Sequence, residues 1–452
     1  MKTAEEKLNK LWYTAPLTFF AAALLPEYVA PVLMAVCFIL VIKSRSKLGN
    51  ETRFGSVGTA LLAFIAYMVI GMTYSSGIVT SLASVALWAF MLCGFWFTYT
   101  VLDSQTKIQK MFFVGSVSSG ISGAIGILQM LLFHYGEYIA KGLNKFFNPF
   151  WHFLDIAFSK IVLILPQAAA EMLPKTKFNV FPTRACSTFT NPLFFAAFEV
   201  FMLPFSAYCF LCMKQKKHRI IGLVCFFLSI GGIASSYSRG PYLAAAAVVV
   251  LLLLYGGKKA LAIGTAGVGS AAVMMIFASG TVKRIFTLIL SKNDISLNTR
   301  AQVWNAVFDM IKKRPVFGYG TGFDNVRQIL HNVYHVKQPH AHNIIFEIWL
   351  ENGVFGVILF AAMLIIFTLN IIKLSKIGKK QRYIAVTLFA SVSGFVLCGM
   401  TDCLFYGFKP LQYFMLILGI SQAVFTMYLK DKQIYLLPES ARIKIASFFS
   451  KK

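Results

Sequence analysis

Long apolar runs alternate with short polar turns along almost the whole chain. A helix needs about 20 residues to cross the hydrocarbon core of a bilayer, and twelve runs approach or reach that length. The predicted spans cover residues 12–25, 28–43, 55–73, 78–101, 111–133, 190–213, 219–235, 241–255, 259–279, 342–372, 383–401 and 407–429. The pattern predicts an all-α polytopic membrane protein with about 12 transmembrane helices, forming a single integral membrane domain over residues 1–452.

Two longer segments interrupt this alternation, at residues 134–189 and 280–341. The first contains an apolar stretch broken by Lys160 and Pro166, which we expect to lie along the membrane interface. The second contains "TRAQVWNAVFDMIKKRP", whose apolar residues recur at helical spacing up to a proline, so we expect an amphipathic helix resting on the bundle. The "FGYGTGF" that follows has no strand before it, so we interpret it as a tight turn rather than a dinucleotide loop.

The composition supports a membrane protein. The 452 residues are 58% hydrophobic and 13% charged, whereas about a quarter of the residues in a soluble domain are charged. A net charge of +26 would suggest nucleic acid in a soluble protein, but cytoplasmic turns of membrane proteins collect Lys and Arg. We therefore predict no nucleic-acid partner. The eight cysteines mostly lie inside apolar runs, so neither a disulfide framework nor a metal site is predicted.

The distribution of basic residues predicts the topology. If the N-terminus is cytoplasmic, the inner turns contain "KSRSKLGNETR", "DSQTKIQK", "MKQKKHR", "GGKK" and "KLSKIGKKQR", followed by a basic cytoplasmic tail at residues 430–452. Short basic turns on one side satisfy the positive-inside rule, and long loops are exempt from it. We predict a multi-pass protein of the cytoplasmic membrane with both termini cytoplasmic and the loops 134–189 and 280–341 extracytoplasmic.

Three polar clusters then reach the same outer face. Arg184 precedes one span in "FPTRACSTFTNP", Arg239 lies in the turn "SSYSRGP", and His340 and His342 begin another span in "HAHN". Each has an ordinary alternative: an arginine at the interface that extends its charge to water, a helix cap, or an interfacial histidine. Their convergence on one face is the strongest signal for function.

The side chains in these clusters suit transfer from a lipid diphosphate. The planar guanidinium of arginine binds phosphate oxygens in pairs and stays charged, and two of them would stabilise a departing diphosphate. Histidine accepts a proton near neutral pH, and neighbouring arginines would favour its neutral form. We predict sugar transfer to an acceptor hydroxyl at this face, with no nucleotide, metal or other cofactor.

Three carboxylates accompany these clusters. Glu347 and Glu351 lie one helical turn apart and share a face, and we expect them to be ion-pair partners of the arginines. Asp402 is at the outer end of the span 383–401. It is as suited to capping a helix as to orienting a base.

The segment "HNIIFEIWLENGVFG" has the form H-N-x9-G-x-x-G, and it resembles the signature of the O-antigen ligase and polymerase superfamily. The stretches "NTRAQVWNAVFDMIKKRPVFGYGTGFDN", "RACSTFTNP" and "SYSRGP" are also similar to that family, so the resemblance runs from about residue 184 to residue 356. It implies a metal-independent membrane glycosyltransferase that takes a glycan from undecaprenyl diphosphate in cell-surface polysaccharide biosynthesis. The implied acceptor is a glycan, a lipid or the cell wall.

The resemblance assigns roles residue by residue. His342 matches the essential histidine of the family, and Arg184 and Arg239 match its outward arginines, which are proposed to bind the donor diphosphate. Residues that could support them in the site are His340, Asn343, Arg300, Arg314, Trp304, Glu347 and Asp402.

Several functions remain open. Ligases and repeat-unit polymerases share donor and sidedness, so the sequence does not separate them, and we favour the ligase slightly. A lipid-linked glycan flippase or transporter is the alternative of another class, but it would place polar groups near the midplane. A purely structural membrane partner leaves the convergence of histidine and arginines unexplained.

Overall fold

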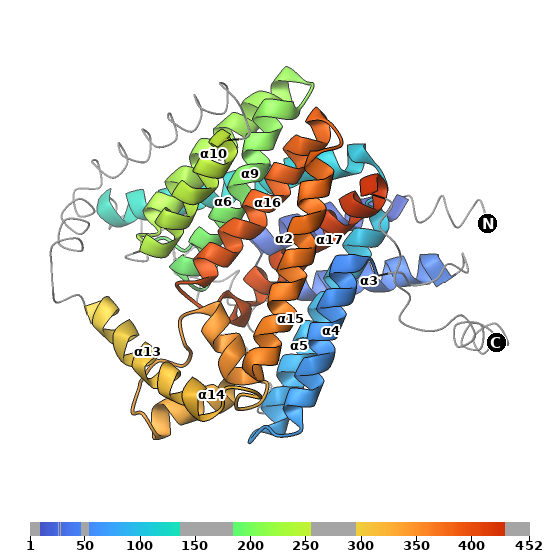
Figure 1. The fold of residues 1–452 in the computed structure, drawn as a ribbon. Helices are drawn as coiled ribbons and strands as arrows, with labels where there is room; N and C mark the ends of the chain where they lie inside the picture. Colours follow the sequence, from blue (N-terminus) through green and yellow to red (C-terminus); the bar gives the residue numbers. More distant parts are fainter. Residues whose placement is uncertain are drawn as a thin grey trace.

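The computed structural model describes residues 10–25, 27, 29–46, 54–135, 184–254 and 295–429. Helices make up all of the regular structure in these ranges (Figure 1). The elements are η1 (Leu11–Tyr13), α2 (Thr14–Leu24), α3 (Val29–Ser46), α4 (Ser56–Met72), α5 (Ile78–Val101), α6 (Gln105–Tyr135), α9 (Pro192–Cys212), α10 (Lys216–Ser235), a helix at Arg239–Leu254, α13 (Ile295–Lys313), α14 (Phe323–Asn332), α15 (Ile344–Ser375), α16 (Lys379–Gly399), η2 (Leu404–Tyr406) and α17 (Phe408–Leu429).

The prediction of an all-α polytopic membrane protein is confirmed. Among the described residues, seven helices are long and apolar enough to cross a membrane: α5, α6, α9, α10, α15, α16 and α17. Four shorter apolar helices coincide with the predicted spans 12–25, 28–43, 55–73 and 241–255. The span predicted at 259–279, most of the loop 134–189 and the tail 430–452 lie outside the described residues, so the number of twelve stays a prediction.

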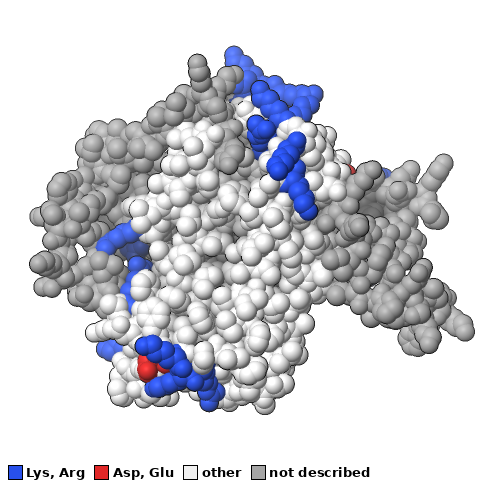
Figure 2. Space-filling view, in the orientation of Figure 1, with Lys and Arg blue, Asp and Glu red and all other residues white. Residues whose placement is uncertain are grey.

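The surface is organised as expected for a protein surrounded by lipid. Large apolar side chains face outward, including Leu243 and Leu254, which are 75% and 71% exposed. Figure 2 shows Lys and Arg at the top and bottom of the visible face and at its left edge, around a broad uncharged surface. Charge is costly at membrane depth and is tolerated at the interfaces, so the uncharged zone marks the part that would lie in the bilayer.

The basic turns and the helices of the second loop lie at opposite ends of the bundle, as the predicted topology requires. The turns between α9 and α10 and between α15 and α16 lie at the same end, and α13 and α14 lie at the other (Figure 1). Both turns belong to the predicted cytoplasmic set, and their lysines, such as Lys216 and Lys379, are exposed. The direction in which the bundle sits in a membrane stays a prediction.

Small residues let the helices pack closely. A Cβ atom at Gly123 of α6 would lie 2.4 Å from the backbone oxygen of Leu228 in α10, and one at Gly120 would lie 2.5 Å from the sulfur of Cys225. Inside a membrane, helices associate through such close van der Waals contact, because lipid is as apolar as the side chains. α17 is the most enclosed helix together with α9, and Tyr413 packs in the centre against Phe19 and Phe198.

The span predicted at 342–372 is not one continuous helix. Gly353 has φ 63° and ψ −169°, a backbone conformation that is essentially restricted to glycine. The break separates a short helical segment, 344–352, from the long span 354–375. The sequence pattern missed it because apolar residues continue across the glycine.

The glycine-rich turn fills this break. Gly318, Gly320 and Gly322 all have positive φ, which confirms the predicted tight turn. The N–H groups of Tyr319 and Gly320 donate to the carbonyls of Leu350 and Glu351 at 2.7 and 3.0 Å. The last carbonyls of a helix have no hydrogen-bond donors within the helix. Here the N–H groups of the turn are their donors.

The predicted amphipathic helix is α13, which ends at Lys313, two residues before Pro315. Trp304 and Phe308 pack edge-on against Phe346 of α15. The buried face of α13 also contacts α14 and the short segment of α15, forming a small second core that contains Val303, Val307, Met310, Val326, Leu330 and Leu350. The described part of the second loop, residues 295–341, therefore packs over the start of α15.

Candidate active site

Arg184 is held by the turn that carries the second arginine. Its Nε donates to the carbonyl of Ser236 at 3.0 Å and its Nη2 to the hydroxyl of Ser238 at 2.7 Å. The loop behind it is fixed by Gln129 of α6, whose side-chain oxygen accepts from the N–H groups of Cys186 and Ser187. Two segments about fifty residues apart are thus joined immediately before Arg239.

Arg239 begins its helix close to the end of α16. A Cβ atom at Gly240 would lie 2.1 Å from the hydroxyl oxygen of Thr401, so the Thr401 side chain packs directly on the backbone of Gly240. Thr401 immediately precedes Asp402. The arginine turn and the loop after α16 are therefore neighbours.

His342 and His340 share one carboxylate. The Nδ1 of His342 lies 3.0 Å from Asp402 Oδ1, and the Nε2 of His340 lies 3.5 Å from the same oxygen. Asn343 caps α15 by accepting from the N–H groups of Ile345 and Phe346, and its Nδ2 donates to the carbonyl of Met400 at 3.2 Å. This cap ties the start of α15 to the end of α16.

The hydrogen bond to Asp402 places the ring of His342 and selects the nitrogen that carries its proton. Burial by itself raises the pKa of Asp402, but the hydrogen bond from His342 and the two imidazoles lower it below its usual value overall. An ionised Asp402 accepts the Nδ1 proton of His342, which leaves Nε2 with its lone pair. That Nε2 lies 3.3 Å from the side-chain oxygen of Gln338, itself an acceptor, so the lone pair is free for a substrate proton once this amide turns its NH₂ to the ring or moves aside. Burial lowers the pKa of His340 to about 4, so this second ring is neutral near pH 7.

Backbone geometry also marks the three clusters. Among the described residues other than glycine, only Ser187, Tyr237, His335 and His342 have positive φ. The first two lie within three residues of Arg184 and Arg239, and the fourth is the candidate base itself. Such conformations are costly and concentrate at functional sites.

The histidine cluster also has the side chains of a cation site. One donor atom from each of His340, His342 and Asp402 lies within 4.8 Å of the other two, and imidazole with carboxylate suits several divalent metals. His342 and Asp402 are hydrogen-bonded to each other, and Nδ1 of His340 accepts from the backbone N–H of His342. Metal independence therefore stays a prediction.

The remaining candidates divide into two groups. Trp304 reaches the site, because its Nε1 donates to the carbonyl of Ala341 at 3.0 Å, between the two histidines. Arg314 is exposed and lies 5.0 Å from the ring centre of Tyr319. No hydrogen bond or ion pair of the described residues joins Arg300 or Arg314 to His342.

The expected ion pairs of Glu347 and Glu351 with the arginines are wrong. The hydroxyl of Tyr406 is hydrogen-bonded to both carboxylates. Glu347 also accepts from the N–H of Ala341 at 2.7 Å, and Glu351 from the N–H of Gly322 at 3.1 Å. Helical spacing placed the two carboxylates on one face correctly, but their partner comes from η2.

The comparison with known families agrees with this geometry. Residues 224–361 match the family described as O-antigen ligase. This match confirms the resemblance to the O-antigen ligase and polymerase superfamily. It covers Arg239, His340 and His342, while Arg184 and Asp402 lie outside it. A comparison with curated proteins found no match.

Some residues of this candidate site were missed by sequence reasoning. Tyr406 follows Glu351 by 55 residues and carries no motif. Ser238 and Gln338 lie beside recognised clusters but have no signal of their own. Tyr406, Ser238 and Gln338 are found only through their contacts in the folded structure.

Proposed function

We propose that this membrane protein moves a glycan from undecaprenyl diphosphate to an acceptor hydroxyl at the outer face of the cytoplasmic membrane. The observation that supports the proposal is the position of residues 401 and 402: Asp402 hydrogen-bonds His342, and the side chain of Thr401 packs against Gly240, next to Arg239. A base held next to a diphosphate clamp is the arrangement that this transfer requires.

In the proposed reaction the acceptor oxygen attacks the anomeric carbon of the donor sugar. The bond between that carbon and the diphosphate oxygen breaks, and undecaprenyl diphosphate leaves with the electron pair. Nε2 of His342 takes the proton of the acceptor hydroxyl, while Asp402 orients the ring and stabilises the imidazolium that forms. Arg184 and Arg239 hold the diphosphate. A single displacement inverts the anomeric configuration.

The ligase reading remains slightly preferred, and repeat-unit polymerisation is the alternative with the same donor chemistry. The two differ in the product: a ligase gives one modified acceptor, whereas a polymerase gives a ladder of repeats. A flippase would move the lipid-linked glycan without forming a bond. Reconstitution with an undecaprenyl-diphosphate oligosaccharide, followed by sizing of the products, separates all three.

The proposal predicts that His342→Ala lowers glycan transfer by about 10²- to 10⁴-fold, the usual contribution of a general base. Membrane insertion and protein level should be unchanged. His331→Ala is the matched control, because His331 is exposed on α14 and bonds only to its neighbour Asn332 among the described residues.

Transfer should also persist in EDTA. Full activity in His342→Ala would remove the histidine from the chemistry. Loss of activity in EDTA, with recovery on adding a divalent cation, would instead assign the histidine cluster to a metal.

A further inference from the structure

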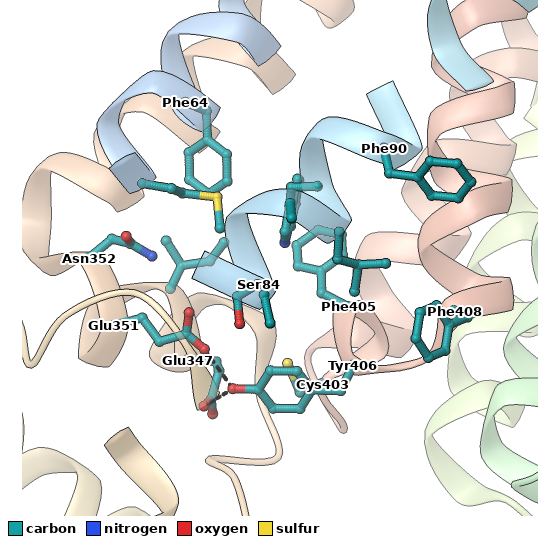
Figure 3. Close-up of a pocket in the computed structure, with 16 residues that line it drawn as sticks. Phe64, Ser84, Phe90, Glu347, Glu351, Asn352, Cys403, Phe405, Tyr406 and Phe408 are labelled. Carbon is teal, nitrogen blue, oxygen red and sulfur yellow. Dashed lines mark hydrogen bonds between the residues drawn. The ribbon is translucent and has the colours of Figure 1, made fainter. Parts of the chain in front are cut away.

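A largely apolar cavity lies beside the histidine site, and the proposed mechanism does not use it. Its volume is about 460 Å³, and its walls come from α4, α5, the first part of α15 and the segment Cys403–Phe408. Figure 3 shows aromatic side chains such as Phe64 and Phe90 on its walls, with Glu347, Glu351 and Tyr406 together at one end. Small-ligand sites have volumes of roughly 300–1,000 Å³ and a few polar groups in an apolar lining.

The polar end can accept further hydrogen bonds. Each oxygen of Glu347 and of Glu351 has one hydrogen bond, from Tyr406, Ala341 or Gly322. A carboxylate offers about four acceptor positions, so each retains capacity at the cavity. Hydroxyl donors match this chemistry. A phosphate does not, because its negative charge would lie next to that of the buried Glu347–Glu351 pair.

The cavity is also on the correct side of the base. Thr401 contacts Gly240 beside Arg239, Asp402 binds the two histidines, and Tyr406 contacts the two glutamates. The segment 401–406 therefore runs from the arginine turn, past the histidines, to the cavity, and the rings of His340 and Tyr406 are 5.6 Å apart. In a displacement the acceptor attacks opposite the leaving group, so it must enter from the side away from the arginines.

We infer that this cavity binds the acceptor, and that it receives an uncharged, hydroxyl-bearing sugar of an acceptor glycan. Glu347 and Glu351 accept hydrogen bonds from its hydroxyls, and Tyr406 holds the two carboxylates in place. The C–H face of the sugar packs on the aromatic wall, which includes Trp88 and Phe405. This inference rests on the proposed function.

The occupant can be captured in cells that carry the natural substrates. Ala83 lines the cavity, whereas the neighbouring Leu82 is 56% exposed on the outside of the same helix. Each is replaced by p-benzoylphenylalanine, the cells are irradiated, and the adducts are analysed by mass spectrometry. The inference expects a glycan adduct without a polyprenyl chain at position 83 and not at position 82. A polyprenyl adduct at 83, or equal labelling at both positions, would overturn it.

A second measurement tests the two carboxylates. Glu347→Gln and Glu351→Gln should each lower the glycan adduct at position 83 and the transfer rate by about tenfold or more, as expected when a site loses hydrogen bonds to substrate hydroxyls. Glu199→Gln is the matched control, since Glu199 is equally buried but does not line the cavity. Unchanged adduct and rate in both variants would reject the assignment.

The two proposals fail separately. If purified wild-type protein forms no glycosidic bond from an undecaprenyl-diphosphate oligosaccharide, the proposed function is lost whatever the crosslinks show. If bond formation occurs but position 83 captures the donor lipid, only the acceptor assignment is lost.

Discussion

At the scale of single residues, the candidate site is centred on the carboxylate of Asp402, which contacts the imidazoles of both His340 and His342. Asp402 is 8% exposed and His342 19% exposed, so their hydrogen bond is protected from competing water. His340 is similarly enclosed, at 16%, and its Nε2 lies 3.5 Å from the same oxygen. The second histidine therefore lies against the carboxylate, while in the proposed mechanism the first exchanges a proton with substrate.

The depressed pKa of His340 predicts a loss of stability in acid. Its pKa is about 4 in the folded protein against 6.5 in an exposed histidine, so below pH 6.5 the unfolded chain binds the proton more readily. Stability should fall as pH drops from about 6.5 to 4, by at most about 3 kcal/mol for this group. Thermal unfolding of the detergent-solubilised protein measures the effect. His340→Gln should flatten this pH dependence, and an unchanged slope in that variant would refute the prediction.

At the scale of elements, the break in α15 positions the catalytic face. The short segment 344–352 carries Glu347 and Glu351, and the span 354–375 is almost entirely apolar. Separating the two lets the polar segment pack under α13 and the glycine turn instead of continuing into lipid. The N–H of Val354 donates to the carbonyl of Pro315 at 3.0 Å, which fixes the direction of the bend.

Gly353→Ala should therefore disrupt the site. A Cβ atom there would lie 1.9 Å from the carbonyl oxygen of Val316 and 2.4 Å from its carbon, and these backbone atoms cannot move aside cheaply. The φ of 63° adds strain for any other residue. We expect glycan transfer to fall at least about tenfold, because small misplacements at a site cost about that or more. Gly378→Ala, in the turn between α15 and α16, is the control. Wild-type transfer by Gly353→Ala would contradict this account of the bend.

At the scale of the whole molecule, the bundle separates two chemically different ends. The basic turns after α9 and α15 lie at one end, and α13, α14 and the glycine turn lie at the other (Figure 1). The arginine turn, the histidine pair and the cavity are built from loops and helix ends, whereas the helices between them are held by small residues and aromatic packing. The candidate site thus lies where lipid does not require every backbone group to be paired within a helix.

This arrangement predicts opposite labelling of two engineered cysteines. With the basic turns in the cytoplasm, Lys312→Cys at the end of α13 should react with an impermeant maleimide in spheroplasts. Lys379→Cys should react only after permeabilisation. The eight native cysteines are buried or half-buried, which keeps the background low. Labelling in the reverse order would show that the bundle has the opposite orientation and that the site faces the cytoplasm.

The sequence alone determined the class of the protein, the positions of its helices and the identity of the main candidates. Hydrophobic runs set by bilayer thickness predict the spans, and spacing places Glu347 with Glu351 and Val303 with Val307. These signals are local, since they depend on period and length along one segment. The motif around His342 belongs to the same kind of information, because its members are close in the chain.

Tertiary structure alone decided how these parts meet. The bend at Gly353 follows from backbone contact with Val316, and the pairing of His342 with Asp402 joins residues sixty positions apart. The two glutamates contact Tyr406 instead of the arginines expected from the sequence, and this too is a contact between residues far apart in the chain. Such contacts depend on which helix ends become neighbours, and that is settled by packing of the whole bundle rather than by any pattern within a single helix.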